Sequence, residues 1–138
     1  FDMMIFKFLV AVVKTTLKSS LFCLFVLIPQ GFADWIRITD SNDAVFYVYP
    51  DETEISGGLK RIWELQDLKK TTWKGERSFR HLSEYHCFVK RWRILHYTGH
   101  SDNMGMGSIV SARKDGDWFE VPPKTPRMLI FKSVCEAK

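Results

Sequence analysis

Residues 59–67 read LKRIWELQD, and this stretch decides the fold class. Leu59, Arg61, Trp63 and Leu65 occupy every second position, and the residues between them have the opposite parity. Successive side chains of a β-strand point to opposite faces of a sheet, so the alternation predicts a strand with two different faces. Because a single strand is not stable alone, the flanking sequence must supply its partners.

Short runs with the same period of two flank this stretch and are separated by turn residues, a pattern typical of an antiparallel sheet. Residues 51–58 are interpreted as a loop. Residues 69–80 are polar and carry Gly75, and are interpreted as a second loop. We expect Trp73 in this second loop to fold back over the sheet edge rather than to stand exposed as a contact residue. The predicted strands are residues 35–39, 44–49, 59–67, 85–97, 104–112 and 118–121.

A helix is predicted near the C-terminus. Thr125 followed by Pro126 is a helix start, with a hydroxyl N-cap and a proline at the first helical position. Met128, Phe131 and Cys135 then form one stripe of an amphipathic helix, which predicts that the helix packs on the sheet. The predicted fold class is therefore α+β, an antiparallel sheet of about six strands with a C-terminal helix packed on it.

The first 33 residues have the parts of a secretory signal peptide. An apolar run over residues 21–28 follows three lysines and precedes Pro29, and a small-x-small ending closes at Ala33. We expect cleavage after Ala33, which leaves residues 34–138 as a single exported domain without a stable membrane span. A retained membrane anchor is the competing interpretation, although lysines interrupt the apolar residues. The exported domain is expected in the periplasm, at the cell surface or secreted.

Cleavage would leave two of the three cysteines in the domain. Cys23 lies in the signal, while Cys87 and Cys135 remain as an even pair in a protein that has left the cytosol. We predict that Cys87 and Cys135 form a disulfide that ties the terminal helix to the strand predicted over residues 85–97. Two free buried thiols are the alternative.

The sequence offers no positive sign of catalysis or of a cofactor. Its four histidines are scattered, no nucleophile elbow surrounds a serine, and most carboxylates lie in turns. Residues 1–33 hold three lysines and one aspartate, so their loss lowers the formal net charge from +4 to +2. This weakly basic balance does not indicate nucleic-acid binding. We expect neither an enzyme nor a metal site.

The basic cluster Lys90, Arg91, Trp92 and Arg93 is the candidate binding site. Arginine, lysine and an indole together suit acidic segments or sulfated glycans, through charge-assisted hydrogen bonds and aromatic contact. Strand alternation divides these residues between two faces, so solvated strand edges are the competing interpretation.

The predicted sheet carries more aromatic side chains than a single helix can cover. Tyr47, Tyr49, Trp63 and Trp118 join Trp92 in the predicted sheet. A sheet face with uncovered aromatic side chains favours homodimer formation through the sheet.

A series of short landmarks runs in order along the chain: Trp35, residues 47–55, Ile62-Trp63, residues 83–87, residues 90–93, residues 104–107, residues 118–122 and Val134-Cys135. Together these landmarks resemble the surface-adhesin protein E family of Gram-negative bacteria. The resemblance implies a secreted or periplasmic domain with an antiparallel sheet, a C-terminal helix and one disulfide. The founding member is an outer-membrane adhesin that binds host matrix proteins. This chain departs from the family at residues 123–126, which stand where relatives tend to carry a Pro-Gly-Ser-like helix entry, and it lacks a lipobox.

Sequence and resemblance together predict an exported, non-enzymatic binding module that contacts host or matrix proteins. The alternative is a periplasmic, envelope-associated structural protein without a host ligand.

Overall fold

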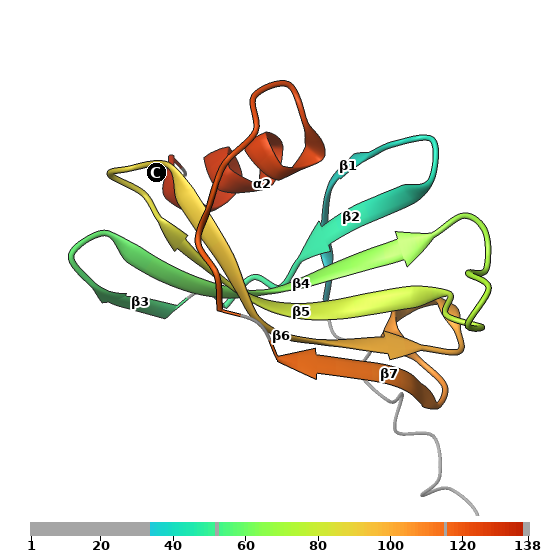
Figure 1. Cartoon of the computed structure of the whole chain (residues 1–138). Coiled ribbons are helices and arrows are strands. Elements are labelled where there is room, and N and C mark those ends of the chain that lie inside the picture. The colour runs from blue at the N-terminus through green and yellow to red at the C-terminus, as the bar shows by residue number, and fades with distance from the viewer. Residues whose placement is uncertain (1–33, 52, 115, 137–138) are drawn as a thin grey trace, which may run out of the picture. The chain divides into compact units, whose positions relative to one another are not determined.

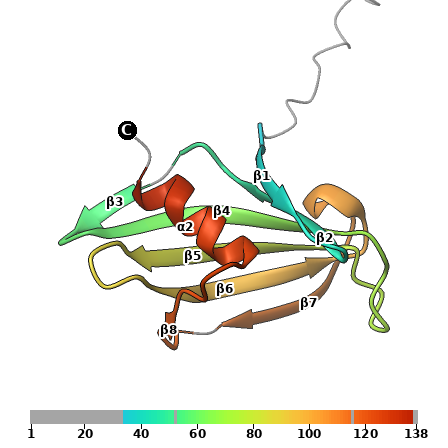
Figure 2. The ribbon, with the colours of Figure 1, turned by 90° about the horizontal axis from the view of Figure 1, so that it is seen from above.

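The computed structural model describes residues 34–51, 53–114 and 116–136. One antiparallel sheet forms the body of this domain, and a single helix lies across one face of it (Figures 1 and 2), which confirms the predicted α+β fold. The signal peptide predicted for residues 1–33 lies outside the described residues. The elements are β1 (Ile36–Asp40), β2 (Ala44–Val48), β3 (Thr53–Ser56), β4 (Leu59–Leu68), β5 (Ser78–His86), β6 (Arg91–His100), the short 3-10 helix η1 (Asn103–Gly105), β7 (Ile109–Lys114), β8 (Phe119–Glu120) and α2 (Pro126–Cys135).

The strand order across the sheet is β1-β2-β4-β5-β6-β7, with β3 beside the start of β4 and β8 beside the start of β6. β4 and β5 lie at the centre and pair over their whole common length, from Leu59 opposite His86 to Asp67 opposite Ser78. Each residue of β4 thus faces its β5 partner on the same side of the sheet. This central ladder sets the positions of the side chains discussed below.

The strand predicted over residues 85–97 is wrong. The structure places two strands there, β5 and β6, joined by a turn over residues 87–90. Lys90 closes this turn with φ 53°, a left-handed conformation that non-glycine residues adopt at some cost. Residues 78–80, which the sequence pattern assigned to the second loop, begin β5, and residues 81–84, to which no element was assigned, continue it.

Three further expectations also differ from the structure. The loop predicted over residues 51–58 contains β3, which pairs with β4. The strand predicted over residues 104–112 begins instead with η1, where Met104 has φ 59°, and pairs with β6 only from Ile109 onward. Trp73 does not fold over the sheet edge, since 90% of its surface is exposed.

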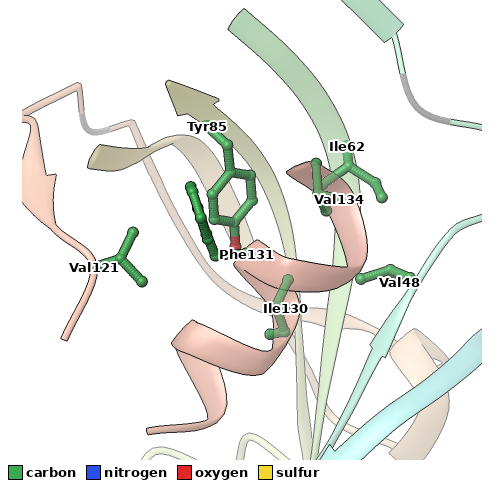
Figure 3. Close-up of a cluster of buried hydrophobic side chains, with 7 residues drawn as sticks. All are labelled: Val48, Ile62, Tyr85, Val121, Ile130, Phe131 and Val134. Carbon is green, nitrogen blue, oxygen red and sulfur yellow. The ribbon is translucent and has the colours of Figure 1, made fainter. Parts of the chain in front are cut away.

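Helix α2 begins as predicted. The Thr125 side chain accepts a hydrogen bond from the backbone N–H of Met128, and Pro126 occupies the first turn. Of the three residues in the predicted apolar stripe, Phe131 is buried in the core, whereas Met128 and Cys135 are partly buried and pack against the core. The core that joins α2 to the sheet (Figure 3) consists of Val48, Ile62, Tyr85, Val121, Ile130, Phe131 and Val134.

The predicted disulfide between Cys87 and Cys135 is present. It joins the turn after β5 to the last residue of α2, so that helix and sheet are linked covalently as well as by packing. The Lys60 ammonium also donates a hydrogen bond to the Val134 carbonyl, 2.9 Å away, and so holds the helix end over β4.

Candidate binding surface on the helix-free face

The face of the sheet under α2 contains a buried ionic network. The Tyr85 hydroxyl donates a hydrogen bond to Oε1 of Glu64 at 2.5 Å, and Nη1 of Arg127 donates to Oε2 of Glu64 and to the Tyr85 oxygen at 2.5 and 2.6 Å. Burial is the largest single influence and would raise the pKa of Glu64, but the charge of Arg127, the nearby His81 and the hydrogen bonds from Tyr85 and Arg127 together hold this pKa below its ordinary value. This carboxylate is therefore ionised and fully paired.

His81 lies beside this network on the same face of β5. Burial lowers the pKa of His81 to about 4, so the imidazole is neutral at physiological pH. The centre of its ring lies 5.9 Å from that of Tyr97, in an edge-on contact, and 6.3 Å from that of Phe79, in a tilted one. Because helix and sheet seal Glu64 and His81 from solvent, these groups serve the fold rather than an accessible reaction site.

The opposite face of β4, β5 and β6 carries no α-helix among the described residues, and we call it the helix-free face. η1 covers one end of it: Asn103 and the backbone N–H of Met104 donate hydrogen bonds to the Asp67 carboxylate, and the N–H of Gly105 donates to the Ser78 hydroxyl. Beyond η1 this face is open (Figure 1). It therefore presents side chains of the three longest strands at the surface of the domain.

One half of the helix-free face is built around Glu84. This side chain is 1% exposed, yet two arginines reach it from the neighbouring strands: Arg61 donates from Nε and Nη2 to Oε2, and Arg93 from Nε and Nη2 to Oε1. Burial would raise the pKa of Glu84, but these hydrogen bonds outweigh it and keep the pKa below its ordinary value. The Arg93 guanidinium also lies 4.5 Å from the centre of the Trp118 ring.

The other half is built around Arg80. Its guanidinium carbon lies 5.7 Å from the centre of the Trp35 ring and 5.5 Å from that of Trp63, within cation–π distance of both. Tyr49 packs edge-on against Trp35 at 5.7 Å, and His96 against Trp63 at 5.1 Å. Aromatic rings thus support both indoles that flank the charge.

The predicted basic cluster does not form one site. Lys90 lies exposed in the turn, and Arg91 is exposed at the start of β6. Trp92 faces α2, with the Arg127 guanidinium 3.9 Å from its ring centre, whereas Arg93 faces the other side and binds Glu84. The division between two faces that strand alternation predicted is thus present, and of the two half-buried members only Arg93 lies on the helix-free face.

Comparison with known proteins identifies the family. The model of the surface-adhesin protein E family matches residues 35–136, nearly the whole described domain. The chain belongs to the surface-adhesin protein E family. No curated protein and no solved structure shows a significant match to it.

In this member of the surface-adhesin protein E family, the residues that sequence reasoning missed are those around Arg80. Arg80 was assigned to the end of a loop, so the sequence could not predict the face of the sheet on which its side chain lies. Trp35 and Trp63 are far apart in sequence and meet only because β1, β2 and β4 are neighbours. The one available signal was the aromatic content of the first strands, which pointed to an uncovered face but not to its centre.

Other classes of site find no support in the described part of this family member. No group of three His, Cys, Asp or Glu side chains there lies close enough together to hold a metal ion. Among the same residues, no helix has the length and hydrophobicity needed to cross a bilayer.

Proposed function

We propose that the domain is an exported, non-enzymatic binding module that contacts a protein of the host or of its extracellular matrix through the helix-free face. The observation that carries this proposal is the arrangement of that face. It combines the half-buried indoles of Trp35, Trp63 and Trp118 with guanidinium groups and lies open beyond η1. Tryptophan and arginine are the residues most enriched among those that dominate the energy of protein interfaces.

Membership in the surface-adhesin protein E family supports the same function. A surface role requires export, and we propose that residues 1–33 act as a signal peptide cleaved after Ala33. Intact-mass measurement of the exported protein tests this step. A mass that includes residues 21–33 would show a retained segment instead.

Binding to immobilised fibronectin, laminin and collagen tests the contact function of the purified exported protein. We expect Trp63→Ala to weaken binding about tenfold or more, because it removes an indole from the centre of the face. Trp73→Ala is the matched control, since Trp73 is more exposed but lies in the β4–β5 loop. Equal binding by wild type and Trp63→Ala would contradict the proposed surface.

Location separates this function from its alternative, a periplasmic structural role without a host ligand. Protease added to intact cells should degrade the domain if it acts at the surface. Complete protection of a folded, exported domain until the outer membrane is broken would favour the periplasmic role.

We also propose that the aromatic residues of the helix-free face can mediate homodimer formation. Sedimentation of the wild type and of Trp63→Ala at several concentrations measures it. A monomer at all concentrations would leave the face free for another partner.

A further inference from the structure

Arginines stacked on tryptophans occur in three places in the domain, and in two of them a glutamate completes the arrangement. Arg127 lies over Trp92 and binds Glu64, while Arg93 lies over Trp118 and binds Glu84. The third arginine, Arg80, lies between two indoles but has no carboxylate partner among the described residues.

Arg80 is held in this position without a counterion. Its aliphatic stem lies close to Gly105, where an added Cβ would come within 2.7 Å of Cδ, so η1 packs against the stem. Its Nε is buried and finds no hydrogen-bond acceptor among the described residues. A partly buried charge without a counterion is costly unless a partner supplies the opposite charge.

We infer that Arg80, between Trp35 and Trp63, is the binding site for a carboxylate side chain of an extended acidic segment in a partner protein. This inference rests on the proposed function, because it names the chemistry of the ligand at the same face. The flanking indoles would exclude water from the ion pair and so strengthen its hydrogen bonds.

A second anchoring position lies farther along β5. Glu84 follows Arg80 by four residues on the same face, which is about 13 Å along a strand. Arg61 and Arg93 bind Glu84 through Nε and Nη2 alone, so Nη1 of each has no partner among the described residues. These two guanidinium groups outnumber the one carboxylate they share, and they remain 40% and 29% exposed. The excess charge suits a second carboxylate.

Leu82 lies midway between these two positions and is half-buried. An extended chain repeats its side-chain direction every second residue, so a segment lying along β5 would place an apolar residue here. The expected ligand pattern is therefore acidic, any, apolar, any, acidic.

Charge complementarity also favours an acidic partner. On the helix-free face of β4, β5 and β6 the arginines are Arg61, Arg80, Arg91 and Arg93, whereas the carboxylates are Asp67 and Glu84, both already hydrogen-bonded within the domain. Glu120 of β8 lies opposite Arg91, so the excess of positive charge on these three strands is concentrated around Arg61, Arg80 and Arg93.

Calorimetric titration of the purified exported protein with the peptide Ser-Glu-Thr-Leu-Thr-Glu-Ser tests the inference. We expect this peptide to bind about tenfold more tightly than the same peptide with glutamine at both acidic positions, because a neutral amide cannot form the charge-assisted hydrogen bonds that a carboxylate forms with arginine. Moving the two glutamates to adjacent positions should weaken binding by a similar factor. Equal binding of all three peptides would overturn the inference.

Variants then assign the site to Arg80. Arg80→Gln should abolish the preference for the acidic peptide, and Arg80→Lys should retain part of it, because lysine keeps the charge but not the planar fork. Arg37→Gln is the matched control, since Arg37 is exposed and pairs with Asp40 at 3.1 Å. A preference that survives Arg80→Gln would overturn the assignment, as would its loss in Arg37→Gln.

Other occupants of the site have distinct outcomes. Binding of N-acetylglutamate amide as tight as that of the peptide would overturn the extended segment in favour of a small carboxylate. A dimer that dissociates in Arg80→Gln, with no peptide binding, would identify a second copy as the occupant. If matrix proteins bind and need Trp63 while the acidic peptide does not bind, this inference fails and the proposed function stands. If the peptide binds but no matrix protein does, the proposed contact with host or matrix proteins fails and the carboxylate site at Arg80 stands.

Discussion

Both faces of the sheet carry groups of glutamate, arginine and tryptophan, but the groups on the two faces have different roles. Under α2, the buried Glu64 and the half-buried Arg127 and Trp92 form a group in which the charges are matched. On the helix-free face, Glu84, Arg93 and Trp118 form a similar group, but its arginines remain partly exposed. Around Arg80 the glutamate is missing altogether.

This difference shows how burial changes the role of an ion pair. A buried pair is costly to break because the remaining charge has no solvent, so it makes the packing of α2 specific. A partly exposed pair contributes less to stability and keeps donors for a ligand. The loss of unfolding free energy should therefore be larger for changes on the face under α2 than for changes on the helix-free face. Five changes test this difference, in order of decreasing expected effect.

Arg127→Gln should have the largest effect. It leaves the Glu64 carboxylate buried without its cation, which should cost about 3 to 5 kcal/mol of unfolding free energy. Urea unfolding measures this loss. The double variant Glu64→Gln, Arg127→Gln should recover part of it, because no unpaired charge remains. A loss below about 1 kcal/mol in the single variant would contradict the buried role of the pair.

Removal of the disulfide should come next. The bond closes a loop of 48 residues, for which the chain-entropy account gives about 4 kcal/mol, and measured values for such bonds commonly fall between about 2 and 4. We expect the double variant Cys87→Ser, Cys135→Ser to lower the unfolding free energy by about 2 to 4 kcal/mol. Hydrogen exchange should quicken in α2 before it does in β4 and β5. Uniform quickening would show that the bond does not specifically hold the helix.

Acid should weaken the covered face through His81. The folded pKa of about 4 lies below the ordinary 6.5, so the unfolded chain binds the proton first as the pH falls. The contribution is therefore complete above pH 6.5 and is lost as the pH falls to 4, a change of about 3 kcal/mol. Nearby Glu64 favours the protonated ring and Arg127 opposes it.

Urea unfolding at pH 7 and pH 4 in the wild type and in His81→Asn isolates this contribution from that of the carboxylates. The variant should lose less stability on acidification than the wild type. Identical losses would show that His81 is not the titrating group.

Arg93→Gln should have a moderate effect of about 1 to 2 kcal/mol. Glu84 keeps Arg61 as a partner, and the Arg93 side chain is 29% exposed, so water replaces part of the lost interaction. Thermal unfolding in low and high salt measures it. A loss as large as that of Arg127→Gln would remove the distinction between the faces.

Arg80→Gln should have the smallest effect, below about 1 kcal/mol. It removes two cation–π contacts but also an uncompensated charge, and it leaves no carboxylate behind. The unfolding midpoint should stay close to that of the wild type. Marked destabilisation would mean that Arg80 is needed for the fold, which would weaken the case for a ligand site.

Local sequence signals predicted the parts of the fold that depend on local chemistry. Thr125 and Pro126 marked the start of α2 because N-capping acts within one turn. The alternation in residues 59–67 identified β4, because Trp63 and Ile62 do face opposite sides. The cysteine count predicted the disulfide without any knowledge of distance.

The β5–β6 hairpin could not be found in this way. Its turn contains Cys87, Phe88, Val89 and Lys90, none of which is a common turn residue, and Lys90 takes the left-handed conformation that glycine would normally signal. β5 itself carries polar and charged residues on both faces, and partners on neighbouring elements hydrogen-bond to them: two arginines to Glu84, and Asp102 and Gly105 to Ser78. Such pairs form only across strands, so a single strand does not reveal them.

The disulfide also determines how the domain would respond to a mechanical pull. Tension applied at the two ends of the described domain would pass from the last residue of α2 directly through the Cys135–Cys87 bond into the end of β5. The chain between these cysteines, which includes β6, β7, β8 and most of α2, would bear no load. This segment spans a sequence separation of 48, about 160 Å if fully extended, and that length would not be released. A contact made by Arg80, Trp35 or Trp63 would instead lie within the loaded strands, where force and binding act on the same residues.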